Sequence, residues 1–541
     1  MKNPLALLAA GMFLTSGVSS AATLYWYPTA APNEGGTGTW TGTNAFWSTT
    51  SGATKTIPGT APAAGDNVVF GGTAGLVSVL AGSAPQLGTQ LNDWKVETSN
   101  YVFRSFGSGF TYSVNSFSGA GLSTAVFESN GNNANIFNIR SDTAFNGTIR
   151  NGPGTTSVTK SGTGAWDLSG ATLTYTNVTS IIGGSLWLSE AQIAPNTGLA
   201  NTIRMGNNDN TSGVVVVVGT GGTTTFNRAL GTGTNQVVLG ATLVSTTAGF
   251  GSRNGTLNVN LGGASAEQNW VGNSAFRATN LILGTADSTG TVVFQNGLNI
   301  SADNRVLQIG NGSQAVDAEI SAALRLSGGG SGDFILTKAG AGTLLLSGSS
   351  SAFVGRFNAS EGRTLVNGTL ASTTSNATYG INVASGAILG GDGALTLSNS
   401  ASKLTVAGTL LGGQGAGNQS LTINSNLEMT TNSVLAFGLG LNATDRDQII
   451  RSGGTWSFQS NQRIQLFDAG YNGGELSFAL ITGLAGDPNV TGWSLYNSDP
   501  GISGAFRYDT GTIYFDAVPE PATWVLFGIG AAAVLWYRRR S

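Results

Sequence analysis

Short runs of aliphatic and β-branched residues, each closed by a turn residue, recur in this chain from about residue 70 to residue 450. Clear examples lie at residues 214–218, 237–239, 256–261 and 280–283, and glycine follows each of them directly. Runs of this length and composition between turn residues predict β-strands. Outside the two ends, no stretch of useful length shows the apolar period of an amphipathic helix. The chain is therefore predicted to be all-β and built from many short strands.

The composition indicates a large apolar core beneath an almost uncharged surface. Glycine accounts for 82 of the 541 residues, and charged residues make up 9%, against a usual value of ~25%. The absence of cysteine and histidine excludes disulfides, thiolate metal sites and a Ser-His-Asp triad. A net charge of −3 offers no basic field for nucleic acid. The sequence therefore indicates neither a nucleic-acid-binding protein nor a histidine- or cysteine-dependent enzyme.

An internal repeat favours a solenoid over other all-β folds. Residues 159–170 read TKSGTGAWDLSG and align without a gap to residues 337–348, which read TKAGAGTLLLSG. After each copy a further strand follows a glycine, at residues 183–188 and 362–366. Repeated strand units of this kind are typical of coils that stack on one another.

The repeat resembles a known family. The copy that contains Lys338, together with the downstream 368–370 segment, resembles the autotransporter-associated β-strand repeat, also called the passenger-associated transport repeat. The copy at Lys160 departs from the family pattern at Ala165 and Trp166, where the family has Thr-Leu. The resemblance implies a parallel β-helix, with repeats near 158–188 and 336–370.

We therefore predict a right-handed parallel β-helix, or β-solenoid, with a cap at each end. Glycine and asparagine turn the corners, aliphatic side chains stack inward, and Thr, Ser and Asn face water. At about 20–25 residues per coil, roughly 20 coils would form a rod about 100 Å long. The predicted parts are a Trp-rich N-terminal cap at 23–70, the solenoid at 71–454 and a β-rich C-terminal cap at 455–517.

The tail at 518–541 carries three unlike parts in order. Pro519, Glu520 and Pro521 precede an apolar run at 522–537, and Arg538, Arg539 and Arg540 follow it. This order resembles the PEP-CTERM sorting signal of bacterial surface proteins and implies an exosortase-type processing enzyme. A helix of about 16 residues spans roughly 24 Å, slightly less than a ~30 Å hydrocarbon core. The alternative is a plain C-terminal transmembrane anchor.

The N-terminus agrees with export. Lys2 precedes an apolar stretch at 4–18, and small residues follow it, a pattern typical of a signal peptide. We expect signal peptidase to remove residues 1–22 by cutting between Ala22 and Thr23. The expected location is the inner membrane through the C-terminal helix, then the cell surface or extracellular matrix.

Few residues suggest chemistry. Asp445 and Asp447 would share one face of a strand about 7 Å apart, close to the carboxylate spacing of inverting glycosidases. Asp392 lies in a Gly-Gly-Asp-Gly turn that lacks the repeated pattern of calcium-binding solenoids. We expect no catalytic residue, no metal and no cofactor, and keep Asp445 and Asp447 as an alternative pair.

Exposed aromatic residues are the best candidates for ligand contact, because indole rings stack against sugar rings. The possible glycan contacts are Trp94, Trp187, Trp270 and Trp456, and the alternative for each is a place in the core.

Together these features predict a non-enzymatic, exported bacterial surface or matrix protein, structural or adhesive and associated with exopolysaccharide. The alternative function is a carbohydrate-active β-helix enzyme, a polysaccharide lyase or hydrolase. An autotransporter passenger or a functional amyloid fits less well, because the chain ends in a basic cluster and glycine interrupts its strands throughout.

Overall fold

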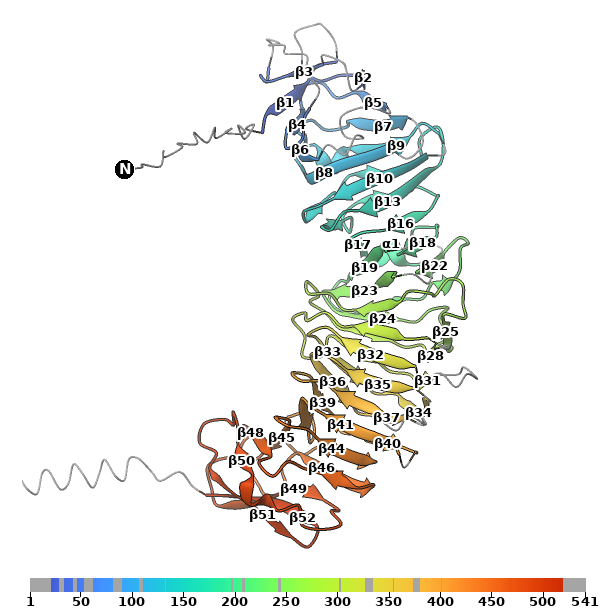
Figure 1. Ribbon diagram of the computed structural model, residues 1–541. Helices are drawn as coiled ribbons and strands as arrows, with labels where there is room; N and C mark the ends of the chain where they lie inside the picture. The colour runs from blue at the N-terminus through green and yellow to red at the C-terminus, as the bar shows by residue number, and fades with distance from the viewer. Residues whose placement is uncertain are drawn as a thin grey trace, which may run out of the picture.

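The computed structural model describes residues 21–518 except for short gaps, at 29–33, 42–45, 53–61, 81–89, 107–109, 132, 196–197, 207–209, 242–244, 301–302, 326–333, 354, 373–379, 400 and 416. The described chain forms a long, curved stack of coils, with its first strands at one end and its last strands at the other (Figure 1).

Each regular coil contributes one strand to each of three faces. In one coil the chain passes through β26 (Asn280–Leu283), β27 (Val292–Phe294) and β28 (Leu298–Ile300). The next strand, β29 (Arg305–Gln308), then pairs in parallel with β26 and starts the following coil. The fold is therefore an all-β parallel solenoid, as predicted, whereas its right-handed sense stays a prediction.

The three faces carry the remaining strands. The first face consists of sheets of 11, 3 and 8 strands, and its members besides β28 are β1 (Thr23–Trp26), β3 (Trp47–Ser48), β4 (Asn67–Phe70), β6 (Leu91–Val96), β8 (Phe110–Ser118), β10 (Asn133–Ile139), β13 (Thr156–Ser161), β16 (Thr179–Ile181), β18 (Ile203–Met205), β21 (Ala229–Leu230), β22 (Gln236–Leu239), β25 (Gln268–Trp270), β31 (Leu324–Arg325), β34 (Ser349–Phe353), β37 (Thr369–Ser372), β40 (Ala394–Leu397), β43 (Ser420–Asn424), β46 (Gln448–Gly453), β49 (Leu476–Thr482), β51 (Gly504–Asp509) and β52 (Thr512–Ala517). The second face is one 13-stranded sheet, formed with β26 and β29 by β11 (Thr143–Ala144), β14 (Ala165–Asp167), β17 (Ser185–Ser189), β19 (Ser212–Val218), β23 (Thr247–Arg253), β32 (Ile335–Ala339), β35 (Arg356–Ala359), β38 (Ile381–Val383), β41 (Lys403–Val406), β44 (Asn426–Met429) and β47 (Trp456–Ser457). The third face has sheets of 6 and 11 strands, formed with β27 by β2 (Gly38–Trp40), β5 (Leu76–Leu80), β7 (Val102–Phe106), β9 (Val126–Ser129), β12 (Thr148–Ile149), β15 (Thr172–Leu173), β20 (Thr223–Phe226), β24 (Thr256–Val259), β30 (Ala318–Ile320), β33 (Thr343–Leu346), β36 (Arg363–Val366), β39 (Ile388–Gly390), β42 (Thr409–Leu411), β45 (Val434–Leu439), β48 (Arg463–Asp468) and β50 (Ser494–Leu495). The short helices are α1 (Glu190–Ile193), η2 (Leu122–Thr124) and η3 (Val490–Gly492).

Coil length varies along the rod. On the second face, successive register partners Leu336, Phe357, Ile381 and Leu404 lie 21, 24 and 23 residues apart, within the predicted range. Near the middle, the step from β19 to β23 is 35 residues, because longer loops leave the coil there. These longer coils leave room for fewer than the 20 coils that were predicted.

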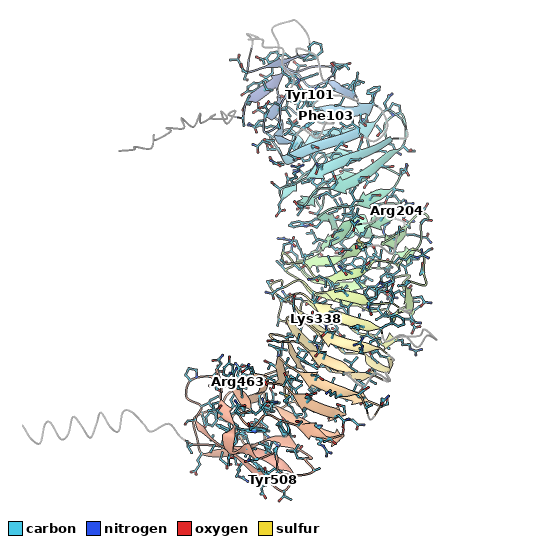
Figure 2. The ribbon with its side chains drawn as sticks, in the orientation of Figure 1. Tyr101, Phe103, Arg204, Lys338, Arg463 and Tyr508 are labelled. Carbon is cyan, nitrogen blue, oxygen red and sulfur yellow. The ribbon has the colours of Figure 1, made fainter. Side chains whose placement is uncertain are left out.

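The interior changes character along the rod, and Figure 2 labels two aromatic residues near its N-terminal end, Tyr101 and Phe103. Toward the N-terminus aromatic rings fill it: the centroid of Trp94 lies 5.4 Å from that of Trp40 and 5.2 Å from that of Phe70. Farther along, aliphatic residues align in register and are fully buried, as in the row of Leu257, Val292, Ala318 and Leu344. Both parts obey the predicted alternation of inward apolar and outward polar side chains.

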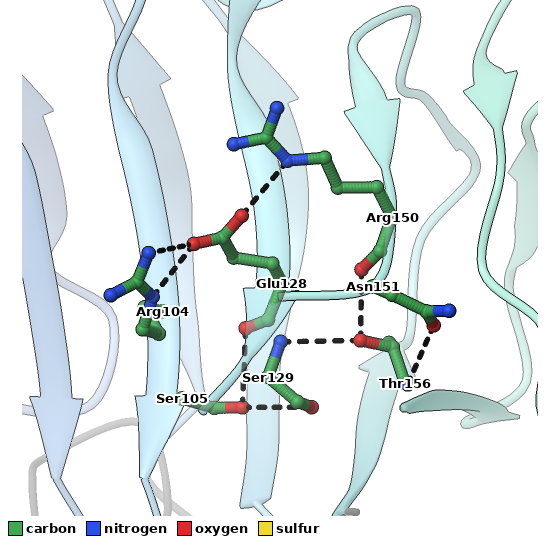
Figure 3. A network of polar contacts seen from close by, with 7 residues as sticks. All are labelled: Arg104, Ser105, Glu128, Ser129, Arg150, Asn151 and Thr156. Atoms are coloured by element: carbon green, nitrogen blue, oxygen red, sulfur yellow. Dashed lines mark hydrogen bonds and ion pairs between the residues drawn. The ribbon is translucent and has the colours of Figure 1, made fainter. Parts of the chain in front are cut away.

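Polar side chains stack from coil to coil as well (Figure 3). Glu128 on β9 is almost fully buried between Arg104 and Arg150, whose Nε atoms lie 2.7 and 2.9 Å from its carboxylate oxygens. Beside it, the backbone N–H of Ser129 donates to Thr156 Oγ1 at 3.2 Å. Because one strand in each neighbouring coil supplies a partner, a buried carboxylate is paired on both flanks.

The repeated lysines are buried at corners of the coil. Lys338 lies on β32 with its side chain buried, and its Nζ donates hydrogen bonds of 2.6 Å to the carbonyl oxygens of Gly340, Gly342 and Glu361. Lys160, 178 residues earlier, donates bonds of 2.9 Å to three carbonyl oxygens in the same way. An ammonium group has three N–H donors, so one side chain bonds to three corner carbonyls at once, although the Gly342 carbonyl also accepts the backbone N–H of Arg363 at 3.3 Å.

The two lysines act at different corners of the rod. Lys160 lies between the first and second faces, whereas Lys338 lies between the second and third. Burial lowers the pKa of Lys160 to about 7 and that of Lys338 to about 8. In each corner a glycine with positive φ, Gly162 or Gly340, makes the turn that the lysine caps.

One coil replaces a third-face strand with α1. Ser189 and Gln192 form a capping box at the start of this helix, and Gln192 Nε2 donates to the carbonyl of Leu168 at 2.8 Å. From the next coil, the buried guanidinium of Arg228 donates to the carbonyls of Ile193, Leu199 and Asn201. Side-chain donors thus supply the bonds that strand pairing provides elsewhere, an arrangement that the sequence did not predict.

Antiparallel pairing between named strands of the described chain occurs only at the two ends. β1 pairs with β3, and β52 pairs with both β49 and β51. These pairs fall within the two segments predicted as caps, 23–70 and 455–517. They add antiparallel strands to the first-face sheet at each end of the stack, where the last parallel strand would otherwise leave its outer backbone groups unpaired.

Removal of the Lys338 ammonium tests the corner bonds. We expect Lys338→Met to lower the free energy of unfolding by about 2 to 3 kcal/mol, because three corner carbonyls would lose their bond to the ammonium group and only that of Gly342 keeps a backbone donor. Urea unfolding followed by circular dichroism would measure the change. Lys403→Met is the matched control, since Lys403 forms an exposed pair with Glu428 and should cost less than about 1 kcal/mol. Equal midpoints for the two variants would contradict the structural role of the corner lysine.

Candidate functional site

The C-terminal cap holds the chain in place up to the start of the tail. β52 lies between β49 and β51, and on β51 the Nε of Arg507 lies 2.7 Å from the carboxylate of Asp516. Beyond β52, the backbone N–H of Val518 donates to the carbonyl of Ser503 at 2.9 Å. The last described residue is therefore anchored to the cap, and the tail begins directly at the end of the rod.

A cavity of about 280 Å³ opens beside this cap, near the end of the second face. Its apolar lining consists of Trp456, Phe458, Leu484 and Pro488. Trp456 is held by a hydrogen bond from its Nε1 to the carbonyl of Ser425 at 3.0 Å. We call this cavity, with its polar rim, the end cleft.

The rim of the end cleft carries polar groups of both signs. Arg451 donates to the carbonyls of Gly454 and Gly483, which fixes the guanidinium at the edge of the cleft. Asp487 and Thr455 are exposed, and one Asp487 oxygen accepts the backbone N–H of Asn489 at 2.7 Å. An aromatic wall with hydroxyl, carboxylate and guanidinium groups at its edge suits a polyhydroxylated ligand.

The other three tryptophans predicted as possible glycan contacts do not offer a free ring. Trp94 and Trp270 are fully buried, so the prediction that they contact glycans is wrong for both. Trp94 packs in the aromatic core, and Trp270 stacks on Phe276 with ring centroids 5.2 Å apart. Trp187 is half-buried, and the guanidinium carbon of Arg253 lies 4.2 Å from its ring centroid, where a sugar would stack.

The structure does not place the two carboxylates of the enzymatic alternative on one face of a strand. Asp445 lies in a turn, and Asp447 lies just before β46 and is fully buried. One oxygen of Asp447 accepts the backbone N–H groups of Gly415 and Gly438, at 2.8 and 3.0 Å. Burial raises the pKa of the Asp447 carboxyl, and its bonds hold a loop rather than a substrate. The predicted strand that would align the two carboxylates does not form.

The remaining acidic candidate serves the backbone too. Asp392 accepts the backbone N–H of Ser420 at 2.9 Å, as expected of a turn residue. Within the described part of the chain, no group of three or more acidic residues comes together to hold a metal ion.

Several residues of the end cleft were not predicted from the sequence. Two segments that lie about 30 residues apart in the chain supply them, and the coil brings these segments together. One segment contributes Arg451, Thr455 and Phe458, and the other contributes Asp487. The one available signal was the rise in aromatic residues after residue 455, which marked the segment but not the cleft.

The remaining predicted sites lie partly outside the described residues. Ala22 and Thr23, the predicted cleavage site, stand at the start of β1, where the Ala22 N–H donates to Asp66 at 2.9 Å. Residues 1–20 of the predicted signal peptide lie outside the described chain, as do the sorting residues, Pro519, Glu520, Pro521, Arg538, Arg539 and Arg540. Among the helices that the structure does describe, none has the length and apolar character needed to span a bilayer.

Comparison with known protein families supports the interpretation of the tail. The PEP-CTERM protein-sorting motif matches residues 517–540. The motif implies export and processing by an exosortase-type system. The comparison gives no support for the autotransporter-associated repeat, so that resemblance stays a prediction. A search of curated proteins finds no match to the chain.

The structural role of Asp447 leads to a test. We expect Asp447→Ala to lower the free energy of unfolding by about 2 kcal/mol or more, because two buried backbone N–H groups would lose their acceptor. Thermal unfolding of the purified chain would measure this. Asp445→Ala, in the adjacent half-buried turn, should change stability by less than about 1 kcal/mol, because the Asp445 side chain bonds only to side chains of the same turn. A stable Asp447→Ala protein that had lost a polysaccharide-degrading activity would instead restore the enzymatic alternative.

Proposed function

We propose that this chain is an exported, non-enzymatic rod that an exosortase-type enzyme delivers to the cell surface or the extracellular matrix. The observation that carries the proposal is the position of the sorting motif, which starts at Ala517, the last residue of β52. The folded rod thus ends where the sorting signal begins. In this proposal signal peptidase removes residues 1–22, and the solenoid winds with a right-handed sense.

Each part of the tail has a physical role in this proposal. The apolar run at 522–537 forms a helix in the inner membrane, and the three arginines keep its end in the cytoplasm. Pro519 and Pro521 keep the backbone between rod and membrane out of helix and sheet, which leaves it open to a processing enzyme. A cut at this point leaves the cap intact, because the bonds of β52 lie wholly upstream of it.

The adhesive part of the proposal concerns glycans. The end cleft combines the Trp456 ring with polar groups on its rim, and the surface of the rod is rich in hydroxyl and amide side chains. Sugars present an apolar C–H face and a ring of hydroxyls, and these two features match the wall and the rim. The proposed role is attachment of the rod to exopolysaccharide or other surface glycans.

Processing of the tail is the first prediction of this function. Intact-mass and C-terminal peptide analysis of the protein from native cells should find a chain that ends near Pro519–Pro521, outside the inner membrane. Replacement of Pro519, Glu520 and Pro521 by alanine should leave the apolar tail attached and the protein in the membrane. The control is Glu475→Ala, which also removes a glutamate but lies upstream of the motif. A wild-type chain that retains residues 522–540 would reduce the tail to a simple anchor.

Glycan contact at the end cleft is the second prediction. We expect Trp456→Ala to weaken binding of neutral oligosaccharides roughly tenfold, since the ring supplies the stacking surface. Affinity electrophoresis with a panel of neutral polysaccharides would measure the change. Trp187→Ala is the matched control, because Arg253 already covers that ring. Equal binding by both variants would remove the end cleft from the proposed function.

A further inference from the structure

A second hollow lies on the outer surface of the third face, away from the end cleft. It measures about 220 Å³, and its floor consists of outward side chains from five neighbouring strands, β36, β39, β42, β45 and β48. At ~4.8 Å per strand these span about 19 Å along the rod. We call it the outer hollow.

The floor of the outer hollow is apolar. Ile388 and Leu411 contribute aliphatic side chains, Ala436 keeps the middle shallow, and Phe467 closes one end. Arg363, the register partner of Ile388, stands at the other end. A volume of about 220 Å³ is below the ~300 Å³ typical of sites for drug-sized molecules, which indicates room for one ring-sized group.

The described residues of the loop, 412–415 and 417–419, form one wall. The wall is fixed at both ends, because Gly415 donates to the buried Asp447 and Gln414 donates to the side chain of Gln419, each at 2.8 Å. It also packs closely over Gly438, where a Cβ atom would lie 2.7 Å from the backbone nitrogen of Gly417. Hydrogen bonds and close packing therefore hold the wall in a fixed position against the rest of the fold.

Arg363 has donor capacity to spare. One terminal nitrogen donates to the carbonyl of Gln414, while Nε is buried with no hydrogen-bond partner and Nη1 makes no bond to a described residue. No acidic residue lines the outer hollow, although the charge of the fully buried Asp447 acts on Arg363 and offsets part of the effect of burial on its pKa. Asp447 does not reach the hollow itself, so a terminal guanidinium nitrogen without a bond to a described residue is left to pair with an anionic ligand there.

Arg363 and Phe467 are close enough to act on one ligand. A Cβ atom at Gly415 would lie 3.9 Å from Arg363 Nη2 and 3.9 Å from Phe467 Cδ2, so these two atoms are less than about 8 Å apart. A pyranose ring that packs on the Phe467 side of the floor would therefore carry a carboxylate within reach of the guanidinium.

We propose that the outer hollow binds a uronic acid residue of an acidic polysaccharide. Its carboxylate pairs with Arg363, its ring packs on Phe467 and Leu411, and its hydroxyls meet Gln414, Gln465 and Thr409. This inference rests on the glycan-associated role proposed above and names a ligand class and a second site for it.

Binding of tri-galacturonic acid by the full-length chain, purified in detergent, tests the proposal. Isothermal calorimetry should detect binding that weakens at least tenfold in Arg363→Gln and in Phe467→Ala, and less in Arg363→Lys, which keeps the charge. Binding should also weaken as salt increases, because an ion pair carries it. Arg325→Gln is the matched control, since Arg325 is exposed on the first face and pairs with Glu267. Circular dichroism of each variant separates lost binding from lost folding.

Several outcomes would overturn the proposal. The first is that the acidic trisaccharide does not bind, and the second is that wild type and Arg363→Gln bind it equally. The third is that Trp456→Ala abolishes binding while Arg363→Gln does not. The fourth is that poly-glutamate binds more strongly than the trisaccharide, which would indicate an acidic peptide as the ligand. If the proposed surface role were wrong, the mass analysis of the protein from native cells would show an unprocessed tail. The two failures are therefore distinguishable.

Discussion

Parallel backbone hydrogen bonding between successive coils is the interaction on which this rod depends. Each strand satisfies its neighbours above and below, but the corners between strands have no such partners. The chain solves this with buried side-chain donors, of which Lys160, Arg228 and Lys338 each satisfy three carbonyls. These cationic side chains are buried inside the protein, which is one reason why so few Lys and Arg side chains are exposed on its surface.

The same logic separates structural from functional polar groups. Asp447 and Asp392 both accept backbone N–H groups, so each carboxylate has a structural role. Arg363 differs in its place, because its guanidinium borders the outer hollow and only one of its terminal nitrogens bonds to the loop. In a protein with so few charged residues, a partly bonded cation beside an apolar hollow is a more specific sign of binding than a carboxylate that already accepts backbone N–H groups. The proposals above therefore concern aromatic and cationic groups rather than carboxylates.

Sequence reasoning predicted the fold more readily than the sites. Short strands closed by glycine, and the repeat around Lys160 and Lys338, sufficed to predict the solenoid, because period and turn residues are local properties. The exposure of a tryptophan is not local: Trp94 and Trp456 look alike in sequence, yet one is in the core and one lines a cleft. The hollow beside Arg363 was missed because residues some 25 positions apart build it, and only the coil brings them together.

The antiparallel strands at the two ends have a consequence for how the molecule can be used. An uncapped solenoid would offer its last coil as a template for the first coil of another copy, and a filament of indefinite length would result. Here β3 at one end, and β52 and β51 at the other, continue the first-face sheet with antiparallel strands, which a parallel coil of another copy does not match. The reach of the molecule is thus set by the number of coils that the gene encodes. Such a protein acts as a spacer of defined length, and any matrix it builds must be joined through its sides or through its ligands.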